Sequence, residues 1–318
     1  MGPSISNQIA TVNGPVGIES LGPILYHEHV VLNVPHVDDL WLPDAATMAN
    51  ELSEFKRRGG RTVISLTNGS MGRDIAALRA ISRQSGVNIL VAAGQYTRKS
   101  SAPIVDSNLL AEEFVSELLS GIGDSNVQAA VIGEIATGRH PISRYERLLF
   151  EAAAIAHRAT GAPIATHTHT GLYARWQLRY LTSLGVDPAR IVIGHMDASF
   201  RNGKPDVDCM SELAAAGAFI GIDTIGLANY YSENLGRFQP SDESRADAIV
   251  ELVERGWTDH ILIAHDLCRR MHLKVNGGCG YGHIYDVFLP MLESRGIGRE
   301  VASKFMVDNP LRWLTGGL

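Results

Sequence analysis

The chain alternates eight times between a short apolar segment and a helical segment, and this rhythm constrains its fold more than any other feature. Each apolar segment is a continuous run of mostly aliphatic residues, which is typical of strands that are buried on both faces. The predicted strands are residues 22–29, 61–67, 88–93, 128–134, 162–167, 190–195, 218–223 and 260–266. No shift in composition divides the 318 residues, so we expect one domain over residues 1–318.

The segments between the predicted strands carry the signals of helix ends. Asp44, Ser143 and Ser241 can each cap the start of a helix, and a glycine ends most of the helices shortly before the next strand. Eight strands that alternate with helices predict an α/β protein with a single (β/α)8 TIM barrel. A doubly wound open sheet is the alternative, but it would be expected to place a glycine-rich phosphate loop after its first strand. Residues 27–29 occupy that place and read His-Glu-His.

Histidine and acidic residues stand at the predicted carboxyl ends of five of these strands. In a barrel, such ends meet at one mouth, where the active sites of this fold lie. Imidazole and carboxylate groups are common ligands of divalent metals, and the two histidines of a His-x-His pair in a strand point to the same face. The predicted metal site therefore consists of His27, His29, Glu134, His167, His195 and Asp266. The alternative is that each of these residues is separately hydrogen-bonded or solvated, which is less plausible for a set of six than for any one of them.

The charge, apolar runs and cysteines of the chain indicate which partners and cellular locations to expect. The formal net charge of −6 argues against a nucleic-acid or anionic membrane partner. No run of about 18 apolar residues occurs, and the N-terminus does not read as a secretory signal, so we expect neither membrane insertion nor secretion. Cys209, Cys268 and Cys279 are an odd number of widely spaced thiols, which fits a reduced, cytoplasmic protein.

Several segments resemble the phosphotriesterase family of the amidohydrolase superfamily, a group that includes phosphotriesterase-like lactonases. They are Leu25–His29, Gly133–Ile135, Ala162–Thr168, Ile193–Asp197 and Ile263–Asp266, and Gly277–Ile284 resembles the loop after strand eight in lactonase-like members. The resemblance implies a barrel with two divalent metal ions. Zinc is the first expectation, with iron, cobalt, manganese and nickel as alternatives.

The resemblance also implies how the ligands divide between the two ions. His27, His29 and Asp266 would bind the more buried ion, and His167 and His195 the more exposed one. In many relatives a carboxylated lysine at the end of strand four bridges the ions, but residues 127–139 contain no lysine. Glu134 is therefore the expected bridge, as in the members of the family that use glutamate there.

Two divalent ions make hydrolysis the expected reaction. Water that is shared between them would supply a hydroxide nucleophile, and Asp266 would take up its proton. Tyr96, just beyond strand three, falls where lactonase-like relatives carry a tyrosine beside the exposed ion. We expect a lactone or a related carboxylic ester or amide as substrate, with a phosphotriester as the alternative. A ligand-binding relative without catalysis and a deaminase with a single metal ion are further alternatives.

Three other polar residues are further candidates for substrate contact. Arg237 lies in the loop after strand seven, Arg269 in the loop after strand eight, and His283 at the start of the last barrel helix. Asp197 is expected to orient His195 from behind, whereas alternation along the strand turns His265 away from the metals. The family resemblance alone implies a homodimer that acts on a small molecule.

Overall fold

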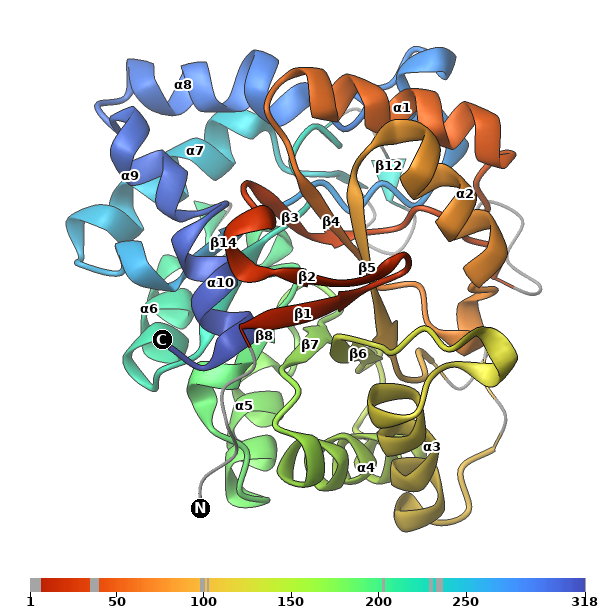
Figure 1. Cartoon of the computed structure of the whole chain (residues 1–318). Coiled ribbons are helices and arrows are strands. Elements are labelled where there is room, and N and C mark those ends of the chain that lie inside the picture. Colours follow the sequence, from red (N-terminus) through yellow and green to blue (C-terminus); the bar gives the residue numbers. More distant parts are fainter. Residues whose placement is uncertain are drawn as a thin grey trace.

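The computed structural model describes residues 7–34, 40–97, 101, 103–201, 204–228, 231–232 and 237–317, and it gives only the backbone of residues 231–232 and 237–238. Its centre is a sheet of eight parallel strands that follow one another in chain order (Figure 1). These strands are β3 (Ile24–Glu28), β4 (Thr62–Ser65), β5 (Asn88–Ala93), β6 (Val131–Ala136), β7 (Ile164–His167), β8 (Ile191–Ile193), β11 (Phe219–Ile222) and β14 (Ile261–Ile263). The predicted (β/α)8 barrel is confirmed.

A helix follows each barrel strand and lies on the outside of the sheet (Figure 1). These helices are α1 (Ala45–Arg57), α2 (Ile75–Ser85), α3 (Ser107–Leu119), α4 (Arg144–Thr160), α5 (Ala174–Ser183), α6 (Val207–Ala215), α7 (Asp242–Glu254) and α8 (Leu289–Ser294). The chain ends in α9 (Arg299–Lys304) and α10 (Asp308–Thr315). The predicted caps are present, since Asp44, Ser143 and Ser241 each accept a hydrogen bond from a backbone N–H of the first turn of their helix.

Three antiparallel pairs of short strands extend the barrel. The hairpin of β1 (Gln8–Thr11) and β2 (Gly14–Gly17) crosses one end of it beside α10 (Figure 1). The other two pairs join β9 (Phe200–Arg201) to β10 (Lys204–Pro205) and β12 (Tyr231–Ser232) to β13 (Arg237–Phe238), in the loops that follow β8 and β11. Because those loops leave the carboxyl ends of the strands, they extend the face on which a barrel carries its active site.

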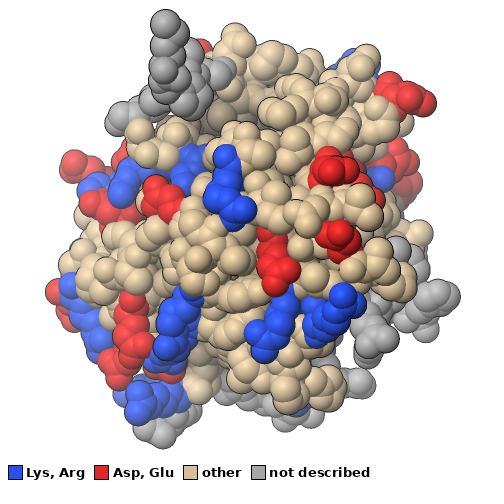
Figure 2. Space-filling view, turned by 90° about the horizontal axis from the view of Figure 1, so that it is seen from below, with Lys and Arg blue, Asp and Glu red and all other residues tan. Residues whose placement is uncertain are grey.

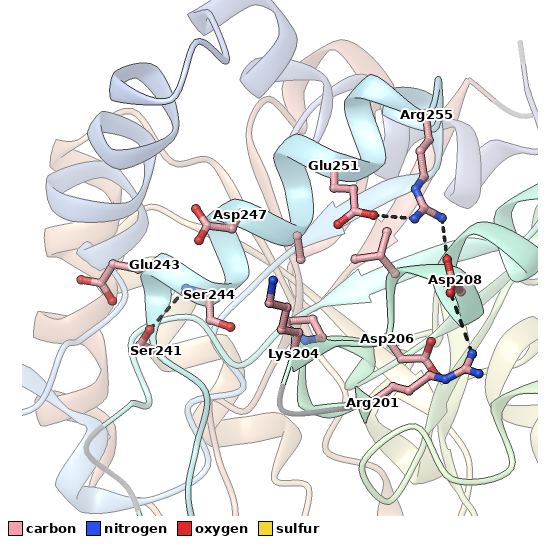
Figure 3. Close-up of a pocket in the computed structure, with 13 residues that line it drawn as sticks. Arg201, Lys204, Asp206, Asp208, Ser241, Glu243, Ser244, Asp247, Glu251 and Arg255 are labelled. Carbon is pink, nitrogen blue, oxygen red and sulfur yellow. Dashed lines mark hydrogen bonds and ion pairs between the residues drawn. The ribbon is translucent and has the colours of Figure 1, made fainter.

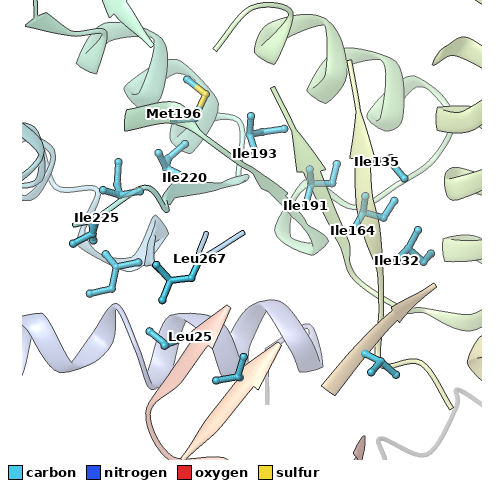
Figure 4. Close-up of a cluster of buried hydrophobic side chains, with 14 of the residues drawn as sticks. Leu25, Ile132, Ile135, Ile164, Ile191, Ile193, Met196, Ile220, Ile225 and Leu267 are labelled. Atoms are coloured by element: carbon cyan, nitrogen blue, oxygen red, sulfur yellow. The ribbon is translucent and has the colours of Figure 1, made fainter. Parts of the chain in front are cut away.

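The apolar side chains of the strands divide between two buried layers. Residues such as Ile132, Ile164 and Ile193 pack outward against the helices, and Figure 4 shows this layer along β6, β7, β8 and β11. The other layer fills the barrel itself, where Ile64 and Trp313 belong to one cluster of buried side chains. This inner cluster fills the barrel below the polar strand ends, which face the mouth.

Two bulges interrupt the regular pairing of the barrel strands, and both lie beside predicted metal ligands. Between β3 and β4, the register shifts from Leu25 opposite Val63 to Glu28 opposite Ser65, so β3 holds one extra residue. A similar shift occurs in β6, between Ile132 and Ile135. A bulge re-aims the side chains around it, which is common next to active sites.

The surface gives two further observations. Basic and acidic side chains are interspersed over the face that Figure 2 shows, and the described residues of that face form no extended area of one sign. None of the described helices is long and apolar enough to span a bilayer.

Candidate metal centre

The structure brings all six predicted ligands together at the carboxyl ends of the barrel strands. His27 lies within β3, Glu134 within β6 and His167 at the end of β7, whereas His29, His195 and Asp266 lie one to three residues beyond the ends of β3, β8 and β14. The backbones of His195 and Asp266 are left-handed, with φ of 58° and 54°. Residues other than glycine rarely adopt this backbone conformation. Here it occurs at two of the predicted ligands, where the chain reaches the mouth of the barrel.

Glu134 occupies the middle of the cluster. Its Oε2 lies 3.4 Å from Nε2 of His27, 3.0 Å from Nδ1 of His167 and 3.8 Å from Nε2 of His195, and its Oε1 lies 3.6 Å from Nε2 of His29. Burial would raise the pKa of this carboxyl, but the charge and hydrogen bond of His167 and the contacts of His27 outweigh it and hold the pKa well below its usual value. An ionised carboxylate thus stands between two groups of imidazoles.

Asp266 completes the group that contains the His-x-His pair. Its Oδ1 lies 3.2 Å from Nε2 of His29 and 3.9 Å from Nε2 of His27. Burial acts to raise the pKa of Asp266, yet the close contact with His29 and the nearby imidazole charges lower it overall. His27, His29 and Asp266 therefore form one group of donors and His167 and His195 another, with Glu134 shared.

A further residue, Asp223, fixes the histidines from behind. It follows β11 directly, is fully buried, and accepts from Nδ1 of His27 at 3.0 Å and from Nδ1 of His195 at 2.8 Å. Burial would lower the pKa of His195, but the charge and hydrogen bonds of Asp223 raise it to about 9. When an ion displaces the proton of Nε2, the proton held on Nδ1 by Asp223 leaves the lone pair of Nε2 directed into the cluster, as in the carboxylate–histidine pairs behind many metals. Sequence reasoning missed Asp223, although its place at the end of an apolar strand was a usable signal.

Neighbouring side chains also fix the orientation of the imidazoles of His29 and His167. Nδ1 of His29 contacts Oγ1 of Thr67 at 2.8 Å, so His29 also turns Nε2 to the cluster. His167 is reversed: its Nδ1 faces Glu134, and Nδ1 also lies 2.8 Å from Nε2 of His195. Three Nε2 atoms and one Nδ1 atom therefore converge on two carboxylates.

The donor set suits divalent metal ions. Nε2 of His27 and Oδ1 of Asp266 are buried, and neither makes a hydrogen bond within the described part of the chain. Buried polar atoms without partners are costly, so their place here is explained if an ion satisfies them. Nitrogen and carboxylate donors in this proportion match zinc and its neighbours in the transition series.

A cavity of about 200 Å³ opens above these residues. Tyr96 lines it, with its hydroxyl 3.4 Å from Nε2 of His167, and burial raises the pKa of this phenol well above its usual value. The phenol is thus a hydrogen-bond donor at neutral pH. The cavity is further lined by Leu40, Thr168, His169, Thr170, Ala198, Thr224, Leu227, Gln239, Cys268, Arg269 and His272.

Not all of the residues that were predicted to contact the substrate or to orient a ligand are found at the cavity. Nε2 of His283 is 2.7 Å from Asp242, and His283 does not line the cavity. The backbone of Arg237 belongs to β13, but its side chain is outside the described part of the chain. The expectation for Asp197 is wrong, because its carboxylate binds Thr224 and the buried Arg245 rather than His195. That carboxylate supports the loops after β8 and β11.

Another hollow, of about 840 Å³, lies between the β9–β10 pair, α6 and α7 (Figure 3). Four of its charged side chains pair with one another: Arg255 contacts Asp208 at 2.9 Å and also Glu251, and Arg201 lies 3.8 Å from Asp208. It shares no lining residue with the cavity above the metal ligands. Its size alone therefore does not make it the site of chemistry.

Comparison with known proteins agrees with this geometry. Residues 7–314 match the model of the phosphotriesterase family. The phosphotriesterase homology protein of Escherichia coli is 32% identical over 301 residues, which span 93% of this chain and 98% of that protein. Its crystal structure, with phosphate in the active site, matches with a TM-score of 0.84 and covers 93% of this chain and 99% of that one.

Two other relatives carry names of hydrolases. The N-acetyltaurine hydrolase of Salmo salar is 29% identical over 98% of this chain and 99% of its own length. A mutant of a phosphotriesterase-like lactonase from Deinococcus radiodurans matches with a TM-score of 0.83 at 34% identity, over 96% of this chain and 99% of that one. With the barrel, the six convergent side chains and a family match over nearly its whole length, the chain belongs to the phosphotriesterase family.

Proposed function

We propose that this protein is a hydrolase that holds two divalent metal ions and cleaves a lactone or a related carboxylic ester or amide. The observation that carries the proposal is the place of Glu134, whose Oε1 faces His29 and whose Oε2 lies between His27 of the first group of donors and His167 of the second. His27, His29 and Asp266 would hold one ion, His167 and His195 the other, and Glu134 would bridge them. Zinc is the metal that we propose first.

Two such ions, when bound, lower the pKa of a water molecule that they share and polarise a carbonyl oxygen. The protein supplies the remaining groups. Asp266 contacts the centre through Oδ1 and would accept the proton of the water. Tyr96 would donate a hydrogen bond to the substrate's carbonyl oxygen, on which negative charge develops during attack.

The cavity supports a small substrate. A volume of about 200 Å³ is below the usual range of ligand pockets, about 300–1,000 Å³. Arg269 lines the same cavity and would attract an acidic group of the substrate. The names of two relatives, a lactonase and an N-acetyltaurine hydrolase, support attack on a carboxylic carbonyl.

Hydrolysis of a phosphotriester is the second candidate. It is favoured by the relative from Escherichia coli, whose structure has phosphate in its active site. The same ligands would serve both reactions, because a phosphoryl oxygen can be polarised like a carbonyl oxygen.

The test is metal analysis of the purified protein together with a panel of γ- and δ-lactones, aryl esters, N-acyl amides and phosphotriesters. We expect two metal ions per chain and turnover of at least one carbonyl substrate, which an Asp266→Asn variant loses. Turnover of phosphotriesters alone would favour the second candidate. A protein that holds two ions and turns over no member of the panel would contradict both. Light scattering of the same sample would test the homodimer that we propose from the family resemblance, and cell fractionation the cytoplasmic location.

A further inference from the structure

The bulge in β3 places two consecutive side chains, Tyr26 and His27, inside the barrel. Regular alternation would turn one of them toward the helices, but the extra residue between Leu25 and Glu28 removes that alternation. Tyr26 is fully buried in the inner cluster, and its ring lies edge-on against the rings of His27 and Trp313, with centroids 5.7 and 6.1 Å apart. The phenol thus lies directly below the metal ligands.

The hydroxyl of Tyr26 donates a hydrogen bond to Oδ2 of Asp223. The same oxygen accepts from Nδ1 of His27, while Oδ1 accepts from both Nδ1 and the backbone N–H of His195. Asp223 therefore accepts four hydrogen bonds, which fills the capacity of a carboxylate. Of the three residues that donate these bonds, His27 and His195 are proposed metal ligands, whereas Tyr26 is not.

Two glycines make room for this contact. A Cβ atom on Gly221 would lie 2.0 Å from the Tyr26 hydroxyl and 2.8 Å from Oδ2 of Asp223. A Cβ atom on Gly194 would lie 2.4 Å from the carbonyl oxygen of Thr166 and 3.2 Å from the same Oδ2. The neighbouring strands are thus shaped around the hydroxyl and its carboxylate partner, rather than around the aromatic ring alone.

We propose that Tyr26 is a positioning residue of the metal centre, whose hydroxyl holds Asp223 so that His27 and His195 keep Nε2 aimed at the two ions. This inference rests on the proposed function, because it assigns His27 to one ion and His195 to the other. One carboxylate then orients a ligand of each ion. Loosening it would weaken both sites together, with the larger effect at the site of His27, which shares Oδ2 with the hydroxyl.

The test compares Tyr26→Phe with Tyr180→Phe. Tyr180 also donates to a carboxylate, Oε1 of Glu151 at 2.6 Å, but it lies on α5 outside the barrel. The affinity for each of two zinc equivalents is measured by competition with a chromogenic chelator, and the absorption spectrum of the cobalt-loaded protein reports ligand geometry. We expect Tyr26→Phe to bind both equivalents about tenfold more weakly and to alter the cobalt spectrum, whereas Tyr180→Phe matches the wild type.

A purely structural role would show itself differently. If Tyr26→Phe lowers the melting temperature of the metal-free protein but binds both equivalents as tightly as the wild type, the inference is overturned while the proposed function stands. If the wild type itself takes up no divalent ion, the proposed function fails, and the inference fails with it. Should Tyr26→Phe not fold, Asp223→Asn tests the same link from its other end. We expect about 10- to 100-fold weaker binding of both equivalents there, and unchanged binding would overturn the inference.

Discussion

At the scale of single residues, the centre depends on backbone conformations that are costly by themselves. His195 and Asp266 both have positive φ, a conformation that costs of order 1 kcal/mol or more for a residue with a side chain. Asp223 fixes the first of these from two sides, through the backbone N–H and Nδ1 of His195. The hydrogen bonds of the site thus stabilise a geometry that the isolated chain would avoid.

Glu134→Gln should separate bridging from packing. Glutamine has nearly the same volume, but its amide lacks the second anionic oxygen that two cations would share. We expect metal content to fall from two ions per chain to one or fewer, with loss of hydrolysis, as measured by elemental mass spectrometry and the substrate panel. Glu112→Gln, an exposed position on α3, is the control and should keep both ions. A Glu134→Ala protein that retained two ions would rule out the bridge.

Tyr96→Phe should affect turnover without affecting the metals. The hydroxyl lies at the rim of the cavity, and loss of a donor to a developing oxyanion commonly lowers kcat about 100-fold. Because Tyr96 is not among the donors that converge on Glu134, metal content should stay at the wild-type value. Steady-state kinetics with a lactone or an amide checks this, and an unchanged kcat would show that the phenol only packs over the mouth.

At the scale of elements, regular features were predictable from the sequence and irregular ones were not. The runs that end in His167 and His195 appear as β7 and β8 because continuous aliphatic residues specify strands buried on both faces. The bulge in β3 has no recognisable pattern in the sequence. The regular alternation of side chains along a strand therefore could not predict that Tyr26 and His27 both lie inside the barrel. The role of Asp223 depends on which atoms of His27 and His195 face it, and only three-dimensional packing decides that.

The start of α4 allows a prediction about stability. Ser143 accepts a hydrogen bond from the backbone N–H of Glu146, whose carboxylate accepts in return from the backbone N–H of Ser143. Ser143→Ala should lower the free energy of unfolding by about 1 kcal/mol, because it leaves a helix N–H group without its acceptor. Urea denaturation measures this, with Ser116→Ala on the exposed face of α3 as the control. An equal effect of both substitutions would count against the cap.

At the scale of the whole molecule, the barrel has a seam between its first and last strands. The ladder of paired strands runs from β3 through β11 to β14, and a bond from the N–H of Asp266 to the carbonyl oxygen of His27, at 3.2 Å, joins β3 to the segment that follows β14. Glu28, buried between the two histidines of the pair, accepts from the backbone N–H groups of His265 and Leu267 and from Nδ1 of His265. The two histidines of the His-Glu-His segment thus face the metal centre, whereas the glutamate between them helps to close the barrel.

Metal removal should accordingly loosen this seam before the rest of the barrel. His27 and His29 come from one side of it and Asp266 from the other, so an ion that they share would tie β3 to the segment that directly follows β14. A ligand that binds only the native state at 100 times its Kd stabilises that state by about 2.7 kcal/mol. Hydrogen exchange of chelator-treated and zinc-loaded protein should therefore show the largest loss of protection in β3 and β14 and the smallest in β5, which supplies no ligand to the centre. Equal loss in all eight strands would mean that the ions stabilise the barrel as a unit, and that Glu28 and its hydrogen bonds already close the seam without them.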